Sequence, residues 1–194
     1  MTYDELVSAI ANWPDLQGEP DLQAIIPTLI VLAETDINNT AELRLREALV
    51  DVTSSVTDPT LPIDLPTDCL QVERVLVDNV PLTFTTLDNI TVCTNAYAID
   101  GSRLVFSDAQ SEYTLRYYQR LPSLAVVNTH WLLDKSPSLY LYGSLLQAAI
   151  FSKENQQEAL RYITEYQTCI NRLITDDWNA RVPYGQALAS PLAT

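Results

Sequence analysis

The spacing of apolar residues changes twice along the chain and divides it into three stretches. Apolar residues recur every three or four positions over 1–48, every second position over 49–119, and every three or four positions again over 120–179. The first spacing indicates helices with one buried face, and the second indicates strands with one solvent-exposed face. The pattern predicts an α+β protein, in which 1–48 and 120–179 form a helical bundle and 49–119 form an inserted small antiparallel β-sandwich or barrel.

The N-terminal stretch carries helix start and stop signals. Thr2 and Glu5 are spaced as a capping box, in which each side chain accepts a hydrogen bond from the other residue's backbone N–H. Pro14 is expected to end this helix, because proline lacks the N–H that a helix interior needs. The apolar residues at helical spacing are Leu6, Val7, Ile10 and Trp13.

One or two further helices are predicted over 22–46. Pro27 suits the first turn of the longer helix, where its missing N–H costs nothing. Glu34 is expected to face away from the buried side, and Asn38-Asn39-Thr40 is expected to interrupt the helix. The buried stripe is predicted to contain Leu29, Ile30, Ala33 and Ile37.

Short strands joined by turns are predicted throughout the β insert. Asp78-Asn79 and Asp100-Gly101-Ser102 indicate tight turns, because Asp, Asn and Gly tolerate the backbone angles that such turns use. One face of the last strand is expected to carry Tyr113, Leu115 and Tyr117. The predicted strands cover 50–53, 70–77, 81–84, 96–99, 103–106 and 113–119.

Helices return after Pro122. Ser136 is a good N-cap, and Pro137 a good first helical residue. Gly143 is expected to lie where a neighbouring helix approaches closely, because a mid-helix glycine costs about 1 kcal/mol relative to alanine. One helix is predicted to bury Leu139, Tyr142, Leu145, Leu146, Ala149 and Ile150. The last helix is predicted to bury Leu160, Ile163, Tyr166, Ile170, Leu173 and Ile174. Periodicity ends at Ala180, so 180–194 is expected to form an extended C-terminal arm.

Composition narrows the classes of partner. The chain has 194 residues, of which 47% are hydrophobic, so it can bury a core, and its formal net charge is −14. Such a charge disfavours binding to nucleic-acid phosphates and to anionic membranes. Its simplest interpretation is solubility, and the alternative is an acidic lumen past which a polyanion slides. No apolar run approaches the ~18 residues of a membrane helix.

The cysteines and the N-terminus suggest a cellular compartment. The three cysteines, Cys69, Cys93 and Cys169, are dispersed without a CxxC spacing, which favours a reducing compartment. Asp4 and Glu5 stand where a signal peptide would be basic. The protein is therefore expected to be made in a cytoplasm.

Candidate chemistry is sparse. His130 is the single histidine, so an imidazole metal site is not expected, and it is interpreted as a surface or partly packed residue. Cys169 falls beside the apolar face of a helix and is interpreted as a small hydrophobe. Asp176-Asp177 are adjacent, a spacing that does not place both on one helix face. No enzymatic activity and no cofactor are expected, although carboxylate catalysis is kept as the last alternative.

Several spaced motifs together resemble one family. They are Leu65 to Gln71, Leu104 to Phe106, Tyr113 to Tyr118, Pro122 to Leu124, Thr129 to Leu133 and Pro137 to Gly143. This set resembles the head–tail adaptor (connector) proteins of tailed bacteriophages over roughly residues 20–185. Cys69 departs from the pattern, since family members more often carry an aromatic residue there.

The resemblance implies a structural role in the virion. Such proteins form a ring, usually twelvefold, which joins the portal to downstream tail or nozzle proteins and through which DNA passes without sequence-specific binding. It places the protein at the head–tail interface, after assembly in the host cytoplasm. The C-terminal arm would reach the portal, and its proposed contact residues are Trp178, Val182, Pro183, Tyr184 and Leu188.

A different class of function is also open at this point. The β insert at 49–119 is rich in Tyr and Asn and could belong to a tail component that recognises a carbohydrate or receptor. The surrounding helices argue against this alternative, because binding modules of that kind are usually all-β.

Overall fold

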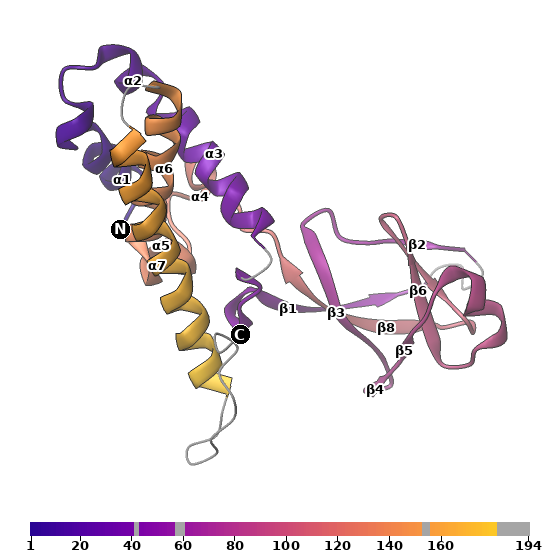
Figure 1. Ribbon diagram of the computed structural model, residues 1–194. Coiled ribbons are helices and arrows are strands. Elements are labelled where there is room, and N and C mark those ends of the chain that lie inside the picture. The colour runs from indigo at the N-terminus through magenta and orange to yellow at the C-terminus, as the bar shows by residue number, and fades with distance from the viewer. Residues whose placement is uncertain (41–42, 57–60, 153–155, 182–194) are drawn as a thin grey trace. The chain divides into compact units, whose positions relative to one another are not determined.

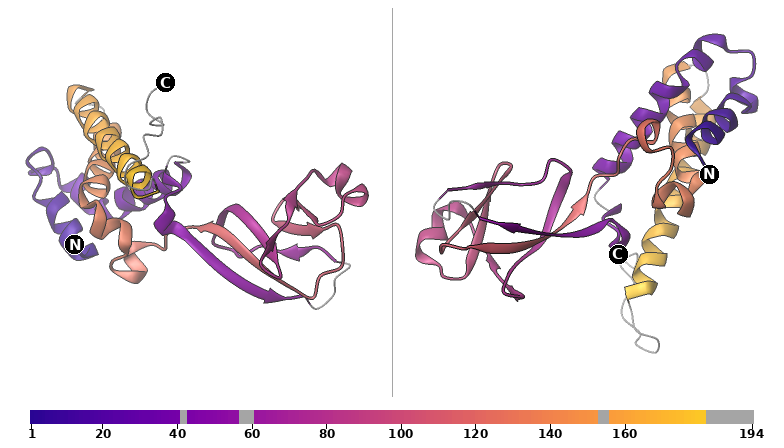
Figure 2. Two further views of the ribbon diagram at one scale, coloured as in Figure 1. Left: turned by 90° about the horizontal axis from the view of Figure 1, so that it is seen from below. Right: turned by 180° about the vertical axis from the view of Figure 1, so that it is seen from behind.

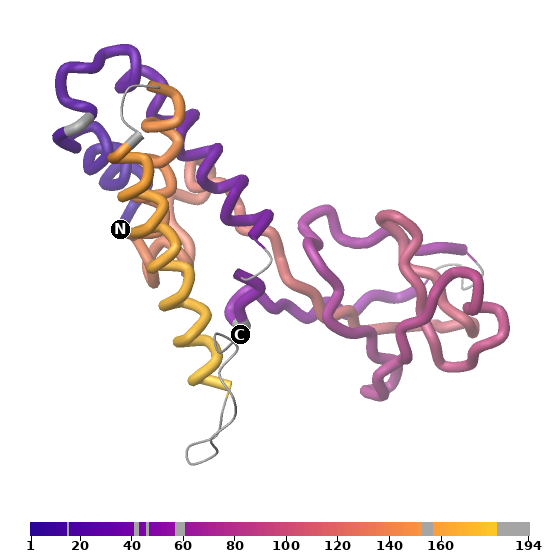
Figure 3. The backbone as a smooth tube through the Cα atoms, viewed as in Figure 1, coloured from indigo at the N-terminus to yellow at the C-terminus, as the bar shows by residue number. Residues whose placement is uncertain are grey.

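The computed structural model describes residues 1–40, 43–56, 61–152 and 156–181. They fold as two compact units, a helical unit from residues 1–47 and the chain from Leu121 onward, and a β unit from Ala48–Arg120. Figure 1 labels the elements, and the tube in Figure 3 shows that described segments from before and after the β unit build the helical unit. The predicted mixture of helices and strands is confirmed.

The helical unit is built mainly from three longer helices. Helices α3, α6 and α7 lie side by side in the views of Figures 1 and 2, with α6 in contact with both others. Short 3-10 turns cover Pro14–Leu16 and Arg46–Ala48. The α-helices are α1 (Tyr3–Ala11), α2 (Pro20–Ala24), α3 (Ile26–Asn39), α4 (Leu124–Val127), α5 (Trp131–Lys135), α6 (Pro137–Ser152) and α7 (Gln156–Arg181).

The predicted capping box closes the start of α1. The Glu5 N–H donates to the Thr2 hydroxyl at 3.3 Å, and the Thr2 N–H donates to the Glu5 carboxylate at 2.8 Å. These bonds satisfy backbone donors that have no partner within the helix. Leu6 and Ile10 are fully buried, and the helix ends at Ala11, ahead of Pro14.

Helix α3 carries the predicted apolar stripe, but the prediction of helix over 22–46 is wrong at 43–45, which are not α-helical. It carries Pro27 in its first turn and ends at Asn39, and the predicted apolar stripe is buried. The expectation for Glu34 is wrong, because its side chain is only 8% exposed. Its carboxylate accepts bonds from the Ser123 hydroxyl at 3.0 Å and the Leu124 N–H at 2.7 Å. Glu34 therefore supplies the N-terminal cap of α4, which a single-helix pattern cannot reveal.

Gly143 lies at the predicted close approach of helices. A Cβ placed on Gly143 would lie 3.2 Å from the Ala33 Cβ of α3 and 3.2 Å from the Tyr166 ring of α7. Both distances are shorter than ordinary van der Waals contacts. The glycine thus lets α6 pack closely against two helices at once.

The predicted burial of α6 and α7 is wrong at three positions. Ile150 on α6 is 59% exposed, and Leu160 and Ile163 on α7 are 64% and 47% exposed. The buried side of α7 instead carries Tyr162, Ile170 and Leu173, whereas Tyr166 and Ile174 are half-buried. The predicted stripe of α7 is therefore covered only from Tyr166 onward.

The β unit contains two four-stranded sheets, with strand orders β1-β8-β3-β4 and β2-β7-β6-β5. The pairing of β5 with β6 is parallel, so the expectation of a purely antiparallel insert is wrong at that pair. The other pairs are antiparallel, and β3 has irregular register against β8. The strands are β1 (Leu49–Ser55), β2 (Ile63–Asp64), β3 (Cys69–Val77), β4 (Val80–Pro81), β5 (Thr83–Phe84), β6 (Ala96–Asp100), β7 (Arg103–Phe106) and β8 (Glu112–Gln119).

Both predicted tight turns are present. Asp78 and Asn79 have φ values of 51° and 63° between β3 and β4, and Gly101 has a φ of 59° between β6 and β7. The two sheets share a core that includes both Leu115 and Leu104, 1% exposed each. The three residues predicted to share one face of β8, Tyr113, Leu115 and Tyr117, do share it, and all three are buried.

Asp68 connects two of the sequence motifs inside the β unit. Its carboxylate accepts bonds from the Tyr117 hydroxyl at 3.1 Å and from the Gln119 amide at 2.7 Å. Burial raises the pKa of Tyr117 to about 12, and the hydrogen bond and charge of Asp68 add to the effect. The Asp68 side chain therefore fastens the segment before β3 to the end of β8.

We expect Asp68→Ala to destabilise the β unit by about 2 kcal/mol. The change leaves the Tyr117 hydroxyl without its acceptor and removes a hydrogen bond to a charged group. Urea denaturation followed by circular dichroism measures the loss. Asp88→Ala is the control, because Asp88 is exposed and forms none of the described side-chain hydrogen bonds. Equal stability of the two variants would contradict the role of Asp68.

Candidate interaction surfaces

The described residues hold no constellation that suggests catalysis by a metal. No group of three or more His, Cys, Asp or Glu side chains lies close enough to bind a metal ion in this part of the chain. Burial raises the pKa of the Cys169 thiol, which opposes its activation as a nucleophile. Asp177 is 8% exposed and pairs with Arg181 at 2.7 Å, whereas Asp176 is exposed. The adjacent carboxylates therefore lie in different environments.

His130 has a structural position at the start of α5. Its Nδ1 accepts the Leu133 N–H at 3.4 Å, and its Nε2 lies 3.2 Å from the Tyr140 hydroxyl. The acceptor role of Nδ1 requires the proton of the neutral ring to be on Nε2. Burial lowers the pKa of His130 below its usual 6.5. The interpretation of His130 as a partly packed residue is confirmed.

We expect the helical unit to lose stability as the pH falls below about 6.5. The folded pKa of His130 is the lower one, so the unfolded chain binds more protons in that window. The stabilisation by the neutral His130 ring is fully present above the pKa of this residue in the unfolded chain. It is lost as the pH falls through the lower pKa that His130 has in the folded protein. The variant His130→Asn keeps a side-chain acceptor for the helix N-terminus but has no group that titrates in this pH range. Urea denaturation from pH 8 to 5.5 should show a flatter profile for this variant, and identical profiles would contradict the assignment.

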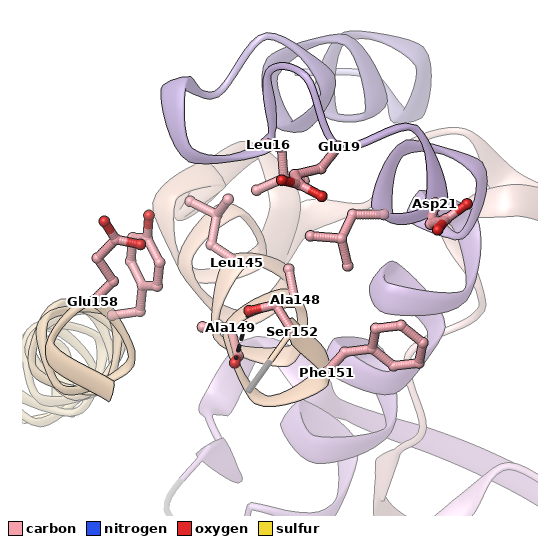
Figure 4. Close-up of a pocket in the computed structure, with 11 residues that line it drawn as sticks. Leu16, Glu19, Asp21, Leu145, Ala148, Ala149, Phe151, Ser152 and Glu158 are labelled. Carbon is pink, nitrogen blue, oxygen red and sulfur yellow. Dashed lines mark hydrogen bonds between the residues drawn. The ribbon is translucent and has the colours of Figure 1, made fainter. Parts of the chain in front are cut away.

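A pocket of about 310 Å³ opens in the helical unit beside α2, α6 and the start of α7. Figure 4 shows Leu145 and Ala148 on α6 beside Leu16, with Glu19, Asp21 and Glu158 carried by the surrounding segments. Glu19 and Asp21 are exposed, and Glu158 is half-buried. The lining contains carboxylates and apolar side chains but no basic residue. The full lining is Leu16, Glu19, Asp21, Leu22, Leu145, Ala148, Ala149, Phe151, Ser152, Glu158 and Tyr162.

The helical unit also exposes large apolar side chains outside its core. Leu160 and Ile163 on α7 are 64% and 47% exposed, and Val126 on α4 is 82% exposed. Further exposed apolar residues are Val31, Leu32, Val127, Ile150 and Phe151.

The β unit has its own pocket of about 870 Å³. It is lined from β3 and its preceding loop on one side and from β5, β6 and the β6–β7 turn on the other. Phe84 is 60% exposed at this pocket, whereas Tyr97 is 5% exposed. A space of this size admits a small ligand, and its residues were not singled out as a site from the sequence.

The basic residues of the β unit lie mostly in ion pairs. The Arg116 guanidinium donates two bonds of 2.6 Å to the Asp51 carboxylate across β8 and β1. Arg74 pairs with Glu73 at 2.8 Å, and Arg103 lies 3.4 Å from Asp64. The hydrogen bond from Arg116 lowers the pKa of Asp51. These neutralised cations do not form a basic patch for phosphates.

The proposed portal-contact residues fall mostly beyond the described part of the chain. Trp178 is half-buried near the end of α7. The other four, Val182, Pro183, Tyr184 and Leu188, lie outside the described residues. Helix α7 continues to Arg181, so residues 180 and 181 are helical and the expectation that the arm begins at Ala180 is wrong by two residues.

Comparison with known proteins identifies a family. Among the described residues, no helix has the length and apolar content needed to cross a membrane. No curated protein matches the chain significantly. The model of the SU10 adaptor protein family matches residues 1–189. This match agrees with the resemblance to phage head–tail adaptors, and the chain belongs to the SU10 adaptor protein family.

Proposed function

We propose that this protein is a head–tail adaptor subunit that joins the portal of a tailed bacteriophage to its downstream tail or nozzle proteins. The observation that carries the proposal is the family match over residues 1–189. The roles of Asp68 and Gly143 add support, because two of the family-like motifs contain residues that organise each unit. The protein belongs at the head–tail interface of the virion after assembly in the host cytoplasm.

In this proposal the subunits form a ring, with twelvefold symmetry, around a channel for DNA. The formal net charge of −14 supports passage without adhesion wherever acidic side chains face the channel. Ion pairing of Arg74, Arg103 and Arg116 argues against sequence-specific DNA binding by the β unit. The protein is proposed to have no enzymatic activity and no cofactor.

The proposed portal contact is the C-terminal arm. Trp178 lies near the end of α7, and the residues after Arg181 include further aromatic and apolar side chains. The arm would bind through Trp178, Val182, Pro183, Tyr184 and Leu188. Such apolar anchors in a terminal segment are suited to docking on a partner.

Negative-stain imaging of the protein alone and mixed with its cognate portal tests the proposal. Binding to a template can drive assembly of a subunit that stays monomeric in isolation. We expect a ring of adaptor density on the portal. An unchanged portal at saturating adaptor concentration would overturn the proposal.

The pocket of the β unit favours one second candidate, a tail component that binds a carbohydrate or receptor. The observation behind it is the exposed Phe84 at the mouth of that pocket, since aromatic rings suit sugar faces. A glycan array with Phe84→Ala as the control distinguishes this candidate. Absence of glycan binding by the unmodified protein would remove it.

A further inference from the structure

We propose that, in the free subunit, residues 184–190 of the C-terminal arm dock as an added strand in the β unit of the same chain. They enter the β3–β6 gap, defined as the pocket between the outer edges of residues 69–74 on β3 and residues 98–100 on β6. This inference deepens the proposed function and rests on it for its consequence, which is that the arm stays in the subunit until a portal takes it.

Strand β3 has a long edge that is open to another strand. On one edge, β8 pairs with β3 from Cys69 to Leu76. On the other edge, β4 pairs only with Leu76 and Val77, and the Val75 carbonyl accepts the Leu82 N–H at 2.9 Å. Among the described strands, none pairs with residues 69–74 on this outer edge. An edge of this kind presents backbone N–H and C=O groups to an incoming extended segment.

Strand β6 has a shorter open edge at the same pocket. Strand β7 pairs along one side of β6, whereas β5 pairs only with Ala96 and Tyr97 on the other. No other described strand covers residues 98–100 on that side. The pocket of about 870 Å³ is lined by residues from both open edges, which include Cys69, Leu70, Gln71, Val72, Glu73 and Ile99. A space bordered by two open strand edges fits an extended peptide.

The side chains of the β3–β6 gap favour an uncharged occupant with apolar side chains. Val72, Phe84 and Ile99 are apolar members of the lining, and Phe84 is 60% exposed there. The two carboxylates of the lining already have cationic partners, because Asp64 pairs with Arg103 and Glu73 with Arg74. A basic segment would therefore find no unpaired carboxylate in this lining.

The arm has the matching composition. Residues 182–194 contain no Asp, Glu, Lys or Arg, although the whole chain has a formal net charge of −14. Pro183 and Pro191 bracket seven residues without proline, and only such residues can donate a backbone N–H to an edge. Seven extended residues span about 23 Å, enough to cover residues 69–74. In that conformation Tyr184 and Leu188 share one face, which suits the apolar lining.

The arm begins near the point where the chain enters the β unit. Glu47 directly precedes Ala48, the first residue of that unit. Burial acts to raise the pKa of Glu47, but the hydrogen bond from Lys135 and the charges of Lys135 and Arg181 lower it below its usual value. A charge acts appreciably over about 10 Å, so Arg181, at the end of α7, lies close to Glu47.

The open edge of β3 begins at the same end of the β unit. Leu49 pairs with Tyr118, and the next residue, Gln119, pairs with Cys69. Cys69 is therefore two strand spacings, about 10 Å, from the first residue of β1. The 13 residues after Arg181 reach at most about 43 Å. This length brings the gap of the same chain within reach, with the arm entering at Cys69 and running parallel to β3.

A photocrosslinker in the arm tests the docking without any portal. The full chain carrying Leu188→p-benzoylphenylalanine is irradiated as the free protein, and crosslinked peptides are identified by mass spectrometry. We expect crosslinks to residues 69–73 or 97–102 in material that runs as a monomer. Val126→p-benzoylphenylalanine is the control, because Val126 is 82% exposed on the helical unit, and it should give no such crosslinks. Crosslinks of residue 188 to other sites, or between two copies, would overturn the proposal.

Two proline variants of the arm form a matched pair. Ala187→Pro lies within residues 184–190, whereas Ala193→Pro lies beyond Pro191. Hydrogen exchange of a peptide covering residues 70–74 is measured in the full chain. We expect Ala187→Pro to speed this exchange at least about tenfold, because proline removes a donor from the middle of the added strand. Ala193→Pro should leave the exchange unchanged. Equal exchange in the two variants would overturn the proposal.

Portal binding tests the consequence. Phe84→Asp and Val80→Asp each add a carboxylate at an exposed residue of the β unit, 60% and 61% exposed, but only Phe84 lines the gap. We expect Phe84→Asp to bind portal at least about threefold more tightly than the unmodified protein, since a released arm no longer has to leave the gap. Val80→Asp should not differ from the unmodified protein. Equal affinity of the two variants would overturn the retention of the arm. Crosslinks in the gap without any binding to portal would overturn the proposed function and leave the docking standing.

Discussion

Removing residues 182–194 should abolish decoration of the portal while leaving a folded monomer. The cut is placed after Arg181 because α7 continues to that residue, where Arg181 pairs with Asp177 at 2.7 Å. The deletion removes four of the five proposed portal contacts, and loss of several apolar anchors from one interface costs well over about 4 kcal/mol. At that cost affinity falls about a thousandfold or more.

Co-sedimentation with portal and negative-stain imaging measure this result. Circular dichroism and thermal unfolding of the truncated protein establish that its helical unit is intact. A finer variant, Tyr184→Ala with Leu188→Ala, should weaken binding in the full-length chain. Decoration at the normal level by the truncated protein would show that the arm is not the anchor. The proposed ring would then need another portal contact.

Gly143→Val should unfold or strongly destabilise the helical unit. A Cβ at this position already meets Ala33 and Tyr166 at 3.2 Å, and the two methyl groups of valine must enter space that both helices fill. We expect a loss of at least about 3 kcal/mol, because overpacking forces buried helices apart. Gly143→Ala should cost much less, since about 1 kcal/mol of helix propensity offsets its tighter contact.

Thermal unfolding monitored at 222 nm measures the series. Ser138→Val is the matched control, because Ser138 is an exposed residue of the same helix and should tolerate valine within about 0.5 kcal/mol. If the Gly143→Val variant had the same melting temperature as the unmodified protein, α6 would not be packed closely against α3 and α7.

Local signals in this sequence predicted local structure well. The capping box at Thr2 and Glu5, the turn at Asp78-Asn79 and the hairpin at Gly101 all appear as expected. Each depends on hydrogen bonds or backbone angles of residues close in sequence, so few distant contacts can override it. The alternation in β8 was equally informative, because period two assigns every side chain to a face.

The failures have a common physical cause. Glu34 was assigned to the solvent side because an isolated helix gives a carboxylate no buried partner, but α4 supplies two donors. Leu160 and Ile163 were assigned to the core because they continue the helical spacing of Ile170 and Leu173, but both are exposed near the start of α7. Helical spacing defines which residues share a side, and only a neighbour decides which side is covered.

Some features of the candidate surfaces were predictable from the sequence, and others appear only in the structure. The sequence indicated the family and an apolar arm after α7, both of which are properties of residues read in order. It did not indicate the pocket of the helical unit, whose walls come from the segment after α1, from α6 and from α7. Segments more than one hundred residues apart become neighbours only when the helices pack.

By itself, the sequence determined the order of helices and strands, their caps and turns, and the family to which the chain belongs. Only the tertiary structure decided that Asp68 fastens two motifs together, that Gly143 meets two helices, and that Leu160 faces outward. The physical reason is the separation along the chain over which each interaction acts. Capping, turn geometry and periodicity act within a few residues, whereas burial and pairing of side chains depend on which distant segments fold against them.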